Sequence, residues 1–314
     1  MSPARAVVFA YHDVGVRCLK TLLSAGVEVP LVVTVRDDPG ETQWYGSVAA
    51  TAADYGLNVI APADANTPEL ARTVEQLAPD LLFSFYYRSM LGAPLLRAAR
   101  RGALNVHGSL LPKYRGRAPV NWAILKGESE SGATLHYMVE RADAGDVVDS
   151  QAVPILEDDD AREVYAKVTV AAETVLARSL PGLIAGTAPR RPQPVLAGQY
   201  FGRRGPADGR IDWGRPAREI HNLVRAVAPP FPGAFGEVGG QRWEIHRTRI
   251  SNVASPRGGP QLFSADGDCY LACGGGGVLR LLAAAEARGP IDLPGLAREL
   301  ARRPVAGCIT QSYD

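Results

Sequence analysis

The chain predicts an α/β protein with a mostly parallel sheet, followed by a smaller domain that is a small β-barrel. Two patterns indicate this organisation. In the first half, short apolar runs alternate with longer amphipathic ones, and strands that alternate with helices form βαβ units around a parallel sheet. Beyond residue 200, several short apolar runs are separated by turn residues, which is typical of a small barrel.

Each element of the first domain follows from its own pattern. Short apolar runs predict strands at 6–10, 30–35, 57–60, 80–85 and 102–107. Amphipathic stretches predict helices at 16–25, 45–55, 68–77 and 118–125. Two further strands are expected at 133–140 and 147–153. A helix from the acidic run 158–160 to about residue 183 closes the domain, with negative charge at its positive end.

The second domain follows a segment without periodicity. Residues 186–198 are rich in Pro and Arg and predict a linker. We therefore expect a first domain at 1–188, a linker at 189–200 and a second domain at 201–314. Its predicted elements are a helix at 217–227 and strands at 234–238, 242–248, 269–272 and 278–282. Gly239-Gly240 is the expected hairpin turn.

Composition excludes several classes of protein. The chain has 314 residues, 46% hydrophobic and 21% charged, as globular proteins do. No run of 18 apolar residues is present, so membrane insertion is not expected. The four cysteines, at 18, 269, 273 and 308, lack the spacing of a metal site or a disulfide framework. Free thiols suit the cytoplasm. A net charge of +1 without a dense Lys/Arg patch argues against a nucleic-acid partner.

Three polar residues lie where predicted strands end. Asn105 and His107 are two positions apart, so a strand points both side chains the same way. The turn that follows lies at the carboxyl end of the sheet, where open α/β sheets bind their ligands. Asp143 follows the 133–140 strand. An amide, an imidazole and a carboxylate can stabilise an oxyanion, move a proton near neutral pH and hold charge, as transfer of an acyl group onto an amine requires.

Structural roles are the alternative for each residue taken singly. Asn105 would then cap a strand end, His107 would pack in a half-buried hydrogen bond, and Asp143 would start a turn with Gly145. The three together, at one predicted strand end, favour the catalytic interpretation only modestly from the residues alone.

A wider motif resembles a known family. Asn105-x-His107-x-Ser-Leu-Leu-Pro112, followed by Asp143-x-Gly145, is similar to the signature of the formyltetrahydrofolate-dependent formyltransferases. The resemblance runs from Val7 to at least Phe235 and weakens after about residue 250. It implies a Rossmann-like catalytic domain, an OB-like barrel domain, and 10-formyltetrahydrofolate as co-substrate without a metal.

One branch of this family is the most similar. The stretches Ala10–Gly15, Phe83–Arg88 and Arg117–Trp122 resemble the enzymes that formylate the 4-amino group of UDP-4-amino-4-deoxy-L-arabinose, a step toward lipid A modification and polymyxin resistance. Methionyl-tRNA formyltransferases carry a basic insertion after the second strand, whereas residues 37–71 here contain no Lys or Arg. Binding of tRNA depends heavily on phosphate contacts by basic side chains, so a nucleotide sugar is the expected partner.

The resemblance also implies roles for individual residues. His107 would be the proton donor or shuttle, with Asn105 and Asp143 stabilising the transition state. The expected folate contacts are Ser89, Met90, Leu91, Arg117, Val139, Glu140, Arg141, Ala142 and Asp143. Arg117 also has a physical reason, because a guanidinium pairs with a carboxylate or phosphate. The expected substrate contacts, Tyr11, His12, Lys113 and Arg115, follow from the residues themselves. Lys113 and Arg115 share the loop of Arg117 and could bind a diphosphate. Tyr11 and His12 end the first strand, where they could line the sugar-nucleotide pocket or simply form a turn.

Other functions stay open from the sequence. Methionyl-tRNA formylation, formyl-folate hydrolysis, formylation of another nucleotide-linked amino sugar and a non-catalytic binding module are the alternatives. The chain resembles a stand-alone enzyme, so a UDP-glucuronic acid decarboxylase acting in the same pathway would be a separate polypeptide.

Overall fold

The computed structural model describes residues 3–37, 40, 43–194, 200–256 and 259–302 and the backbone of 307–308. The chain divides into two compact units, each built from separate stretches. Unit 1 comprises Met1–Pro119, Glu130–Pro154 and Tyr165–Gly202. Unit 2 comprises Val120–Ser129, Ile155–Val164 and Arg203–Asp314. Two segments of the predicted first domain, Val120–Ser129 and Ile155–Val164, therefore belong to the second unit.

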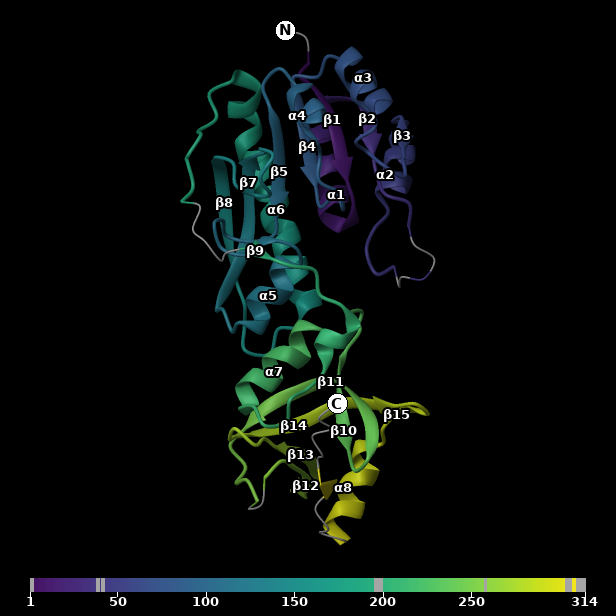
Figure 1. Cartoon of the computed structure of the whole chain (residues 1–314), viewed down its shortest axis with the longest axis vertical. Coiled ribbons are helices and arrows are strands. Elements are labelled where there is room, and N and C mark those ends of the chain that lie inside the picture. The colour runs from purple at the N-terminus through teal and green to yellow at the C-terminus, as the bar shows by residue number, and fades with distance from the viewer. Residues whose placement is uncertain are drawn as a thin grey trace. The chain divides into compact units, whose positions relative to one another are not determined.

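A mostly parallel sheet forms the centre of unit 1 (Figure 1). Its strands are β1 (Arg5–Ala10), β2 (Glu28–Val33), β3 (Val59–Ile60), β4 (Leu81–Phe85), β5 (Ala103–His107), β7 (Glu130–Tyr137) and β8 (Val147–Pro154). They lie in the order β3-β2-β1-β4-β5-β7-β8. The pairs from β3 to β5 are parallel, and β5–β7 and β7–β8 are antiparallel. The predicted fold class of the first domain is confirmed.

Helices connect and cover these strands. Those of unit 1 are α1 (His12–Ser24), α2 (Val48–Asp54), α3 (Pro68–Gln76), α4 (Ala93–Arg97) and most of α6 (Ala161–Ala185), whereas α5 (Pro119–Leu125) belongs almost entirely to unit 2. α3 begins where the Thr67 side chain accepts a hydrogen bond from the Leu70 N–H and a proline takes the first helical position. Val7 and Phe9, alternate residues of β1, pack in one core with Leu70 of α3 and Leu95 of α4. Because these strands are buried on both faces, their sequences are nearly continuous apolar runs.

Unit 2 is built on an antiparallel sheet (Figure 1). Its elements are η1 (Pro206–Gly209), α7 (Ala217–Ala226), β10 (Ala234–Val238), β11 (Gln241–Ser251), β12 (Gln261–Ala265), β13 (Asp268–Ala272), β14 (Val278–Glu286), β15 (Gly289–Pro290), α8 (Leu293–Arg302) and β16 (Gly307–Cys308). The strand order is β10-β11-β14-β13-β12-β16. Gly239 and Gly240 form the β10–β11 turn with φ of 60° and 76°, the left-handed values that a tight hairpin requires. Trp213, Ile245 and Leu279 lie in its core.

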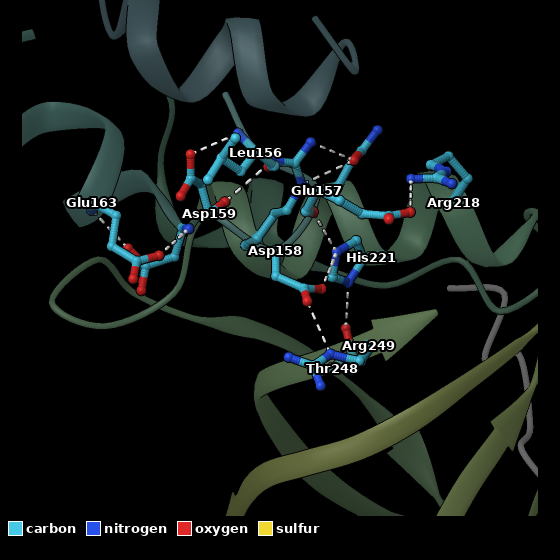
Figure 2. A network of polar contacts seen from close by, with 12 residues as sticks. Leu156, Glu157, Asp158, Asp159, Glu163, Arg218, His221, Thr248 and Arg249 are labelled. Carbon is cyan, nitrogen blue, oxygen red and sulfur yellow. Dashed lines mark hydrogen bonds and ion pairs between the residues drawn. The ribbon is translucent and has the colours of Figure 1, made fainter. Parts of the chain in front are cut away.

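A polar network within unit 2 holds the segment Ile155–Val164 (Figure 2). His221 Nε2 donates to the Glu157 carbonyl at 3.0 Å, which leaves Nδ1 to accept from Thr248 Oγ1 at 2.9 Å. The Arg225 guanidinium donates to the Asp159 carbonyl at 3.1 Å. Because α7 supplies both His221 and Arg225, this helix satisfies backbone carbonyls that no regular ladder pairs.

Several elements differ from the sequence expectations. β7 begins and ends three residues earlier than the predicted 133–140, because Tyr137 N–H bonds to the Asp146 carbonyl and the chain turns there. Residues 261–265 and 293–302 form β12 and α8, neither of which was predicted. Among the described residues, α6 is the one helix long and apolar enough to cross a membrane, and half of its most apolar window is buried inside the protein.

Candidate active site

Three side chains converge at the carboxyl end of β5. Asn105 and His107 lie on the same face of this strand, as their spacing predicts. Asn105 Nδ2 is 3.4 Å from Asp143 Oδ1, and His107 Nδ1 is 3.6 Å from Asp143 Oδ2. The His107 side chain is 6% exposed and that of Asp143 is 14% exposed. An amide, an imidazole and a carboxylate therefore share one largely buried cluster.

The turn after His107 is fixed by side-chain hydrogen bonds. Thr134 Oγ1 donates to the Ser109 carbonyl at 2.6 Å and accepts from the Leu111 N–H at 3.1 Å. Ser109 Oγ donates to the Lys113 carbonyl at 2.6 Å. The Leu111–Pro112 peptide is cis. This turn brings the Tyr114 carbonyl to 2.8 Å from His107 Nε2.

Contacts with neighbouring residues fix the backbone of the loop that contains Asp143. Asp143 has a φ of 50°, a left-handed value that costs a non-glycine residue free energy and is enriched at functional sites. Gln193 Nε2 donates to the carbonyls of Asp143 at 2.9 Å and Gly145 at 2.7 Å. A side chain on Gly145 would overlap the Tyr137 carbonyl, so the Asp-x-Gly spacing serves the close approach of two backbone segments.

His136 completes the cluster and was not predicted from the sequence. It lies directly opposite Asn105 in the β5–β7 ladder, and opposed residues share a face. Its Nε2 is 3.2 Å from Asn105 Nδ2 and 3.5 Å from Asp143 Oδ1. The sequence does show a histidine in the strand that leads to the Asp-x-Gly turn. It does not show the ladder register that places this histidine beside Asn105. Gln193 was also missed, because it falls in the predicted linker.

The backbone assigns the protons of both histidines. A carbonyl oxygen accepts only, so the ring nitrogen against it carries hydrogen. His107 Nε2 faces the Tyr114 carbonyl, and His136 Nδ1 faces the Tyr137 carbonyl at 2.8 Å. In the neutral rings, the unprotonated nitrogens are thus His107 Nδ1 and His136 Nε2, and both face Asp143. A proton that arrives on either ring enters the field of the carboxylate.

The charged form of Asp143 is strongly favoured. Burial of the carboxyl opposes ionisation. The positive charge that the rings of His107 and His136 carry when protonated, together with a hydrogen bond from the Gly116 N–H at 2.9 Å, outweighs that effect and holds the pKa of Asp143 well below its usual range. The cluster therefore contains a fixed negative charge across the whole neutral pH range.

The predicted folate contacts lie on two loops and one turn. Ser89, Met90 and Leu91 follow β4, and this loop is held by Asn66, whose side chain bonds to the Met90 carbonyl at 2.9 Å and to the Gly92 N–H at 2.7 Å. Leu91 is buried, whereas Met90 is 52% exposed. The second loop joins β7 to β8, and it contains Val139, Glu140, Arg141, Ala142 and Asp143. Val139 is 45% exposed. Arg117 is exposed, and its N–H donates to the Phe201 carbonyl at 2.9 Å.

The predicted substrate contacts separate into two places. Tyr11 and His12 follow β1, where Tyr11 Oη bonds to Asp37 Oδ1 at 3.1 Å. Lys113 and Arg115 lie on the turn after β5. Lys113 is exposed, but Arg115 is only 2% exposed and pairs with Tyr200 in the short β6 (Arg115–Gly116) and β9 (Tyr200–Phe201) ladder. Within the described residues, no cluster of three or more His, Cys, Asp or Glu side chains could hold a metal ion.

The α/β fold and this cluster define a protein equipped for acyl transfer at the carboxyl edge of its sheet. Family comparison makes the class specific. The formyl transferase model matches residues 6–180, and the model of the formyl transferase C-terminal domain matches residues 204–297. The chain belongs to the formyl transferase family.

Solved structures of similar fold cover most of the chain. An N-formyltransferase from Helicobacter canadensis, in complex with folinic acid and dTDP-3-aminofucose, has a TM-score of 0.70 at 21% identity and covers 89% of this chain and 99% of its own. WlaRD, a sugar 3N-formyltransferase in the presence of dTDP and 5-N-formyl-THF, has a TM-score of 0.69 at 18% identity, with coverage of 93% and 99%. A sugar N-formyltransferase from Shewanella sp. FDAARGOS_354 has a TM-score of 0.62 at 19% identity, with coverage of 81% and 99%.

Proposed function

We propose that this formyl transferase moves the formyl group of 10-formyltetrahydrofolate to the 4-amino group of UDP-4-amino-4-deoxy-L-arabinose. The observation that carries the reaction type is the convergence of Asn105 and His107 on the Asp143 carboxylate. This cytoplasmic reaction would be a step toward aminoarabinose modification of lipid A and polymyxin resistance. The decarboxylase that acts on UDP-glucuronic acid would be a separate partner in the pathway.

The reaction requires one bond to form and one to break. The amine nitrogen attacks the formyl carbon and forms the new C–N bond, while the carbonyl oxygen becomes an oxyanion. Asn105 Nδ2 donates a hydrogen bond to that oxygen. It is available to do so because its 3.4 Å contact with Asp143 is close to the limit of a hydrogen bond and is readily replaced. The amine proton passes to His107 Nδ1, the ring nitrogen without hydrogen, and the Asp143 carboxylate stabilises the resulting cation. The bond from formyl carbon to N10 then breaks, and N10 receives the proton.

Two exposed apolar side chains support the folate site. Met90 and Val139 lie on the loops that follow β4 and β7, and both are about half exposed. Exposed apolar surface beside a polar cluster is typical of a ligand-binding site. Arg117 is exposed on the turn after β5 and offers a guanidinium to a carboxylate. Relatives of this fold were solved with folinic acid and with 5-N-formyl-THF.

The charge of the chain favours a nucleotide sugar over tRNA. No Lys or Arg occurs from residue 37 to residue 71, and tRNA binding without basic side chains forgoes most of its phosphate contacts. A second candidate acceptor is another nucleotide-linked amino sugar. It is favoured by the relative from Helicobacter canadensis, which was solved with dTDP-3-aminofucose.

One assay distinguishes the acceptors. Purified protein is incubated with 10-formyltetrahydrofolate and, in separate reactions, with UDP-4-amino-4-deoxy-L-arabinose, dTDP-3-aminofucose, methionyl-tRNA or no acceptor. Tetrahydrofolate release and the mass of the product are followed. We expect turnover with the UDP sugar and a loss of about 10²–10³-fold in Asn105→Ala. Turnover with the dTDP sugar alone would replace the acceptor, and turnover with tRNA alone, or formate release without an acceptor, would refute the proposal.

A further inference from the structure

A cluster of aromatic rings lies beside the ends of β1 and β4 in unit 1. We call His12, Trp44, Tyr45, Tyr86 and Tyr165 the aromatic cluster. The His12 ring is at its centre, stacked on Tyr45 with 4.3 Å between ring centroids and edge-on to Trp44 at 4.6 Å. The His12 centroid lies 6.1 Å from that of Tyr86 and 5.7 Å from that of Tyr165.

Two polar atoms in this cluster are buried without a hydrogen-bond partner. They are His12 Nδ1 and Tyr86 Oη. A buried polar atom without a partner costs free energy, so native structures rarely keep one unless a ligand or water completes it. Burial lowers the pKa of His12 to about 4 and raises the pKa of Tyr86 well above its ordinary value. At neutral pH the imidazole is therefore uncharged and the phenol keeps its hydrogen to donate.

The backbone at both residues has the left-handed conformation. His12 has a φ of 66° and Tyr86 a φ of 56°, and neither is a glycine. Tyr86 follows the carboxyl end of β4 directly, and His12 follows that of β1 after one residue. The two strands are parallel neighbours in the sheet. Conformations of this kind are strained for residues other than glycine and are concentrated at ligand sites. The strain and the unpartnered atoms thus occur at the same two residues.

Gly108 connects the aromatic cluster to the catalytic cluster. A Cβ on Gly108 would overlap Tyr86 Oη and lie 3.0 Å from Cζ of the same ring. The Tyr86 hydroxyl therefore lies over the backbone of the residue that follows His107. Only a glycine at this position leaves room for it.

We propose that the aromatic cluster binds the sugar ring of the acceptor, and that Tyr86 Oη donates a hydrogen bond to the sugar hydroxyl next to the amine. The inference rests on the proposed function and extends it from the reacting atoms to the ring that carries them. Aromatic faces cover the C–H surface of a sugar, and the sugar hydroxyls complete polar atoms that are otherwise unpaired. The position of Tyr86 beside Gly108 places its hydroxyl close to His107, where the amine has to lie.

The test compares two acceptors in two proteins. The acceptors are UDP-4-amino-4-deoxy-L-arabinose and its 3-deoxy counterpart, which lacks the hydroxyl next to the amine. For Tyr86→Phe we expect kcat/KM to fall roughly 3- to 10-fold with the first acceptor, as for a lost neutral hydrogen bond, and to stay unchanged with the second. The KM for 10-formyltetrahydrofolate is expected to stay unchanged. Tyr87→Phe, which removes the hydroxyl of the next residue, is the matched control and should affect neither acceptor.

A double-mutant cycle with Gly108→Ala tests the geometry. Because the added methyl group overlaps the hydroxyl, Gly108→Ala should lower kcat/KM more in the wild-type background than in Tyr86→Phe. Three outcomes would overturn the inference: an equal loss of kcat/KM with both acceptors in Tyr86→Phe, no loss with either acceptor, or additive effects in the cycle. In each case turnover of the amino sugar by the wild type would still support the proposed function. If the wild type formylates no amino sugar, the proposed function and this inference both fail.

Discussion

Replacing Asp143 by asparagine tests the electrostatic basis of the site. The two side chains have almost the same shape, and the amide oxygen of the variant can still accept the hydrogen bond from the Gly116 N–H, which lies 2.9 Å from the carboxylate in the wild type. The change therefore removes the charge that faces His107 Nδ1 at 3.6 Å with little change in packing. Proton uptake by His107 then has no carboxylate to stabilise it.

The expected magnitude follows from the distance. Opposite unit charges 3.6 Å apart attract by about 4.6 kcal/mol at an effective dielectric constant of about 20. Partial solvent exposure and rearrangement weaken this attraction, and about half of it, roughly 2 kcal/mol, is expected to be lost in the transition state. That corresponds to a decrease of about 30-fold in kcat. The KM for the amino sugar should change much less, because the cation forms only during the reaction.

The assay measures kcat and KM for both substrates in Asp143→Asn and in Asp146→Asn, a matched control on the same loop. Thermal unfolding of both variants checks that the fold is intact. A kcat for Asp143→Asn within threefold of the wild type would refute the electrostatic reasoning. A large loss of thermal stability with activity lost in proportion would assign Asp143 a structural role instead.

Three further outcomes follow from individual contacts. His136→Gln removes the ring that accepts from the Asn105 amide at 3.2 Å, so kcat should fall about 10-fold, measured by tetrahydrofolate release. Gln193→Ala removes two hydrogen bonds to the loop of the catalytic carboxylate, so kcat should fall and urea unfolding should show a loss of about 1–3 kcal/mol. His221 has its pKa lowered by burial, which outweighs the raising effect of the Glu157 carbonyl. Below about pH 6.5 the unfolded chain therefore binds more protons at this position than the folded chain does. The contribution of His221 to stability is complete above that pH and is lost as the pH decreases. Urea unfolding midpoints at pH 7.5 and 5.5 should therefore differ less in His221→Gln than in the wild type.

The sequence predicted those parts of the site that depend on local periodicity. Asn105 and His107 lie two residues apart in a strand with clear limits, and the period of two places them on one face. Their position at the carboxyl end of the parallel strands followed from the alternation of strands and helices. The pairing with Asp143 was predicted from the resemblance of its motif and not from periodicity. The path of the β7–β8 loop depends on the close approach of Gly145 to the Tyr137 carbonyl, where a side chain would not fit.

Contacts that depend on register or on distant segments could not be predicted. His136 reaches Asn105 only through the β5–β7 ladder, and a strand boundary in error by three residues hides that register. Gln193 belongs to a stretch without periodicity, and nothing in its neighbours indicates that it holds the Asp143 loop. The hydroxyl of Tyr86 against Gly108 is likewise a contact between separate strand ends.

The membership of Ile155–Val164 in unit 2 has a practical consequence for fragments of this enzyme. A catalytic fragment cut near residue 200 would retain the Glu157 and Asp159 carbonyls but lack the His221 imidazole and Arg225 guanidinium that now donate to them. Conversely, a fragment that begins after residue 200 would keep the hydrogen bonds from Arg225 to Asn222 Oδ1 but lose those from His221 and Arg225 to the Glu157 and Asp159 carbonyls. Because each unit is built from separate stretches of the chain, no single cleavage point separates one unit from the other.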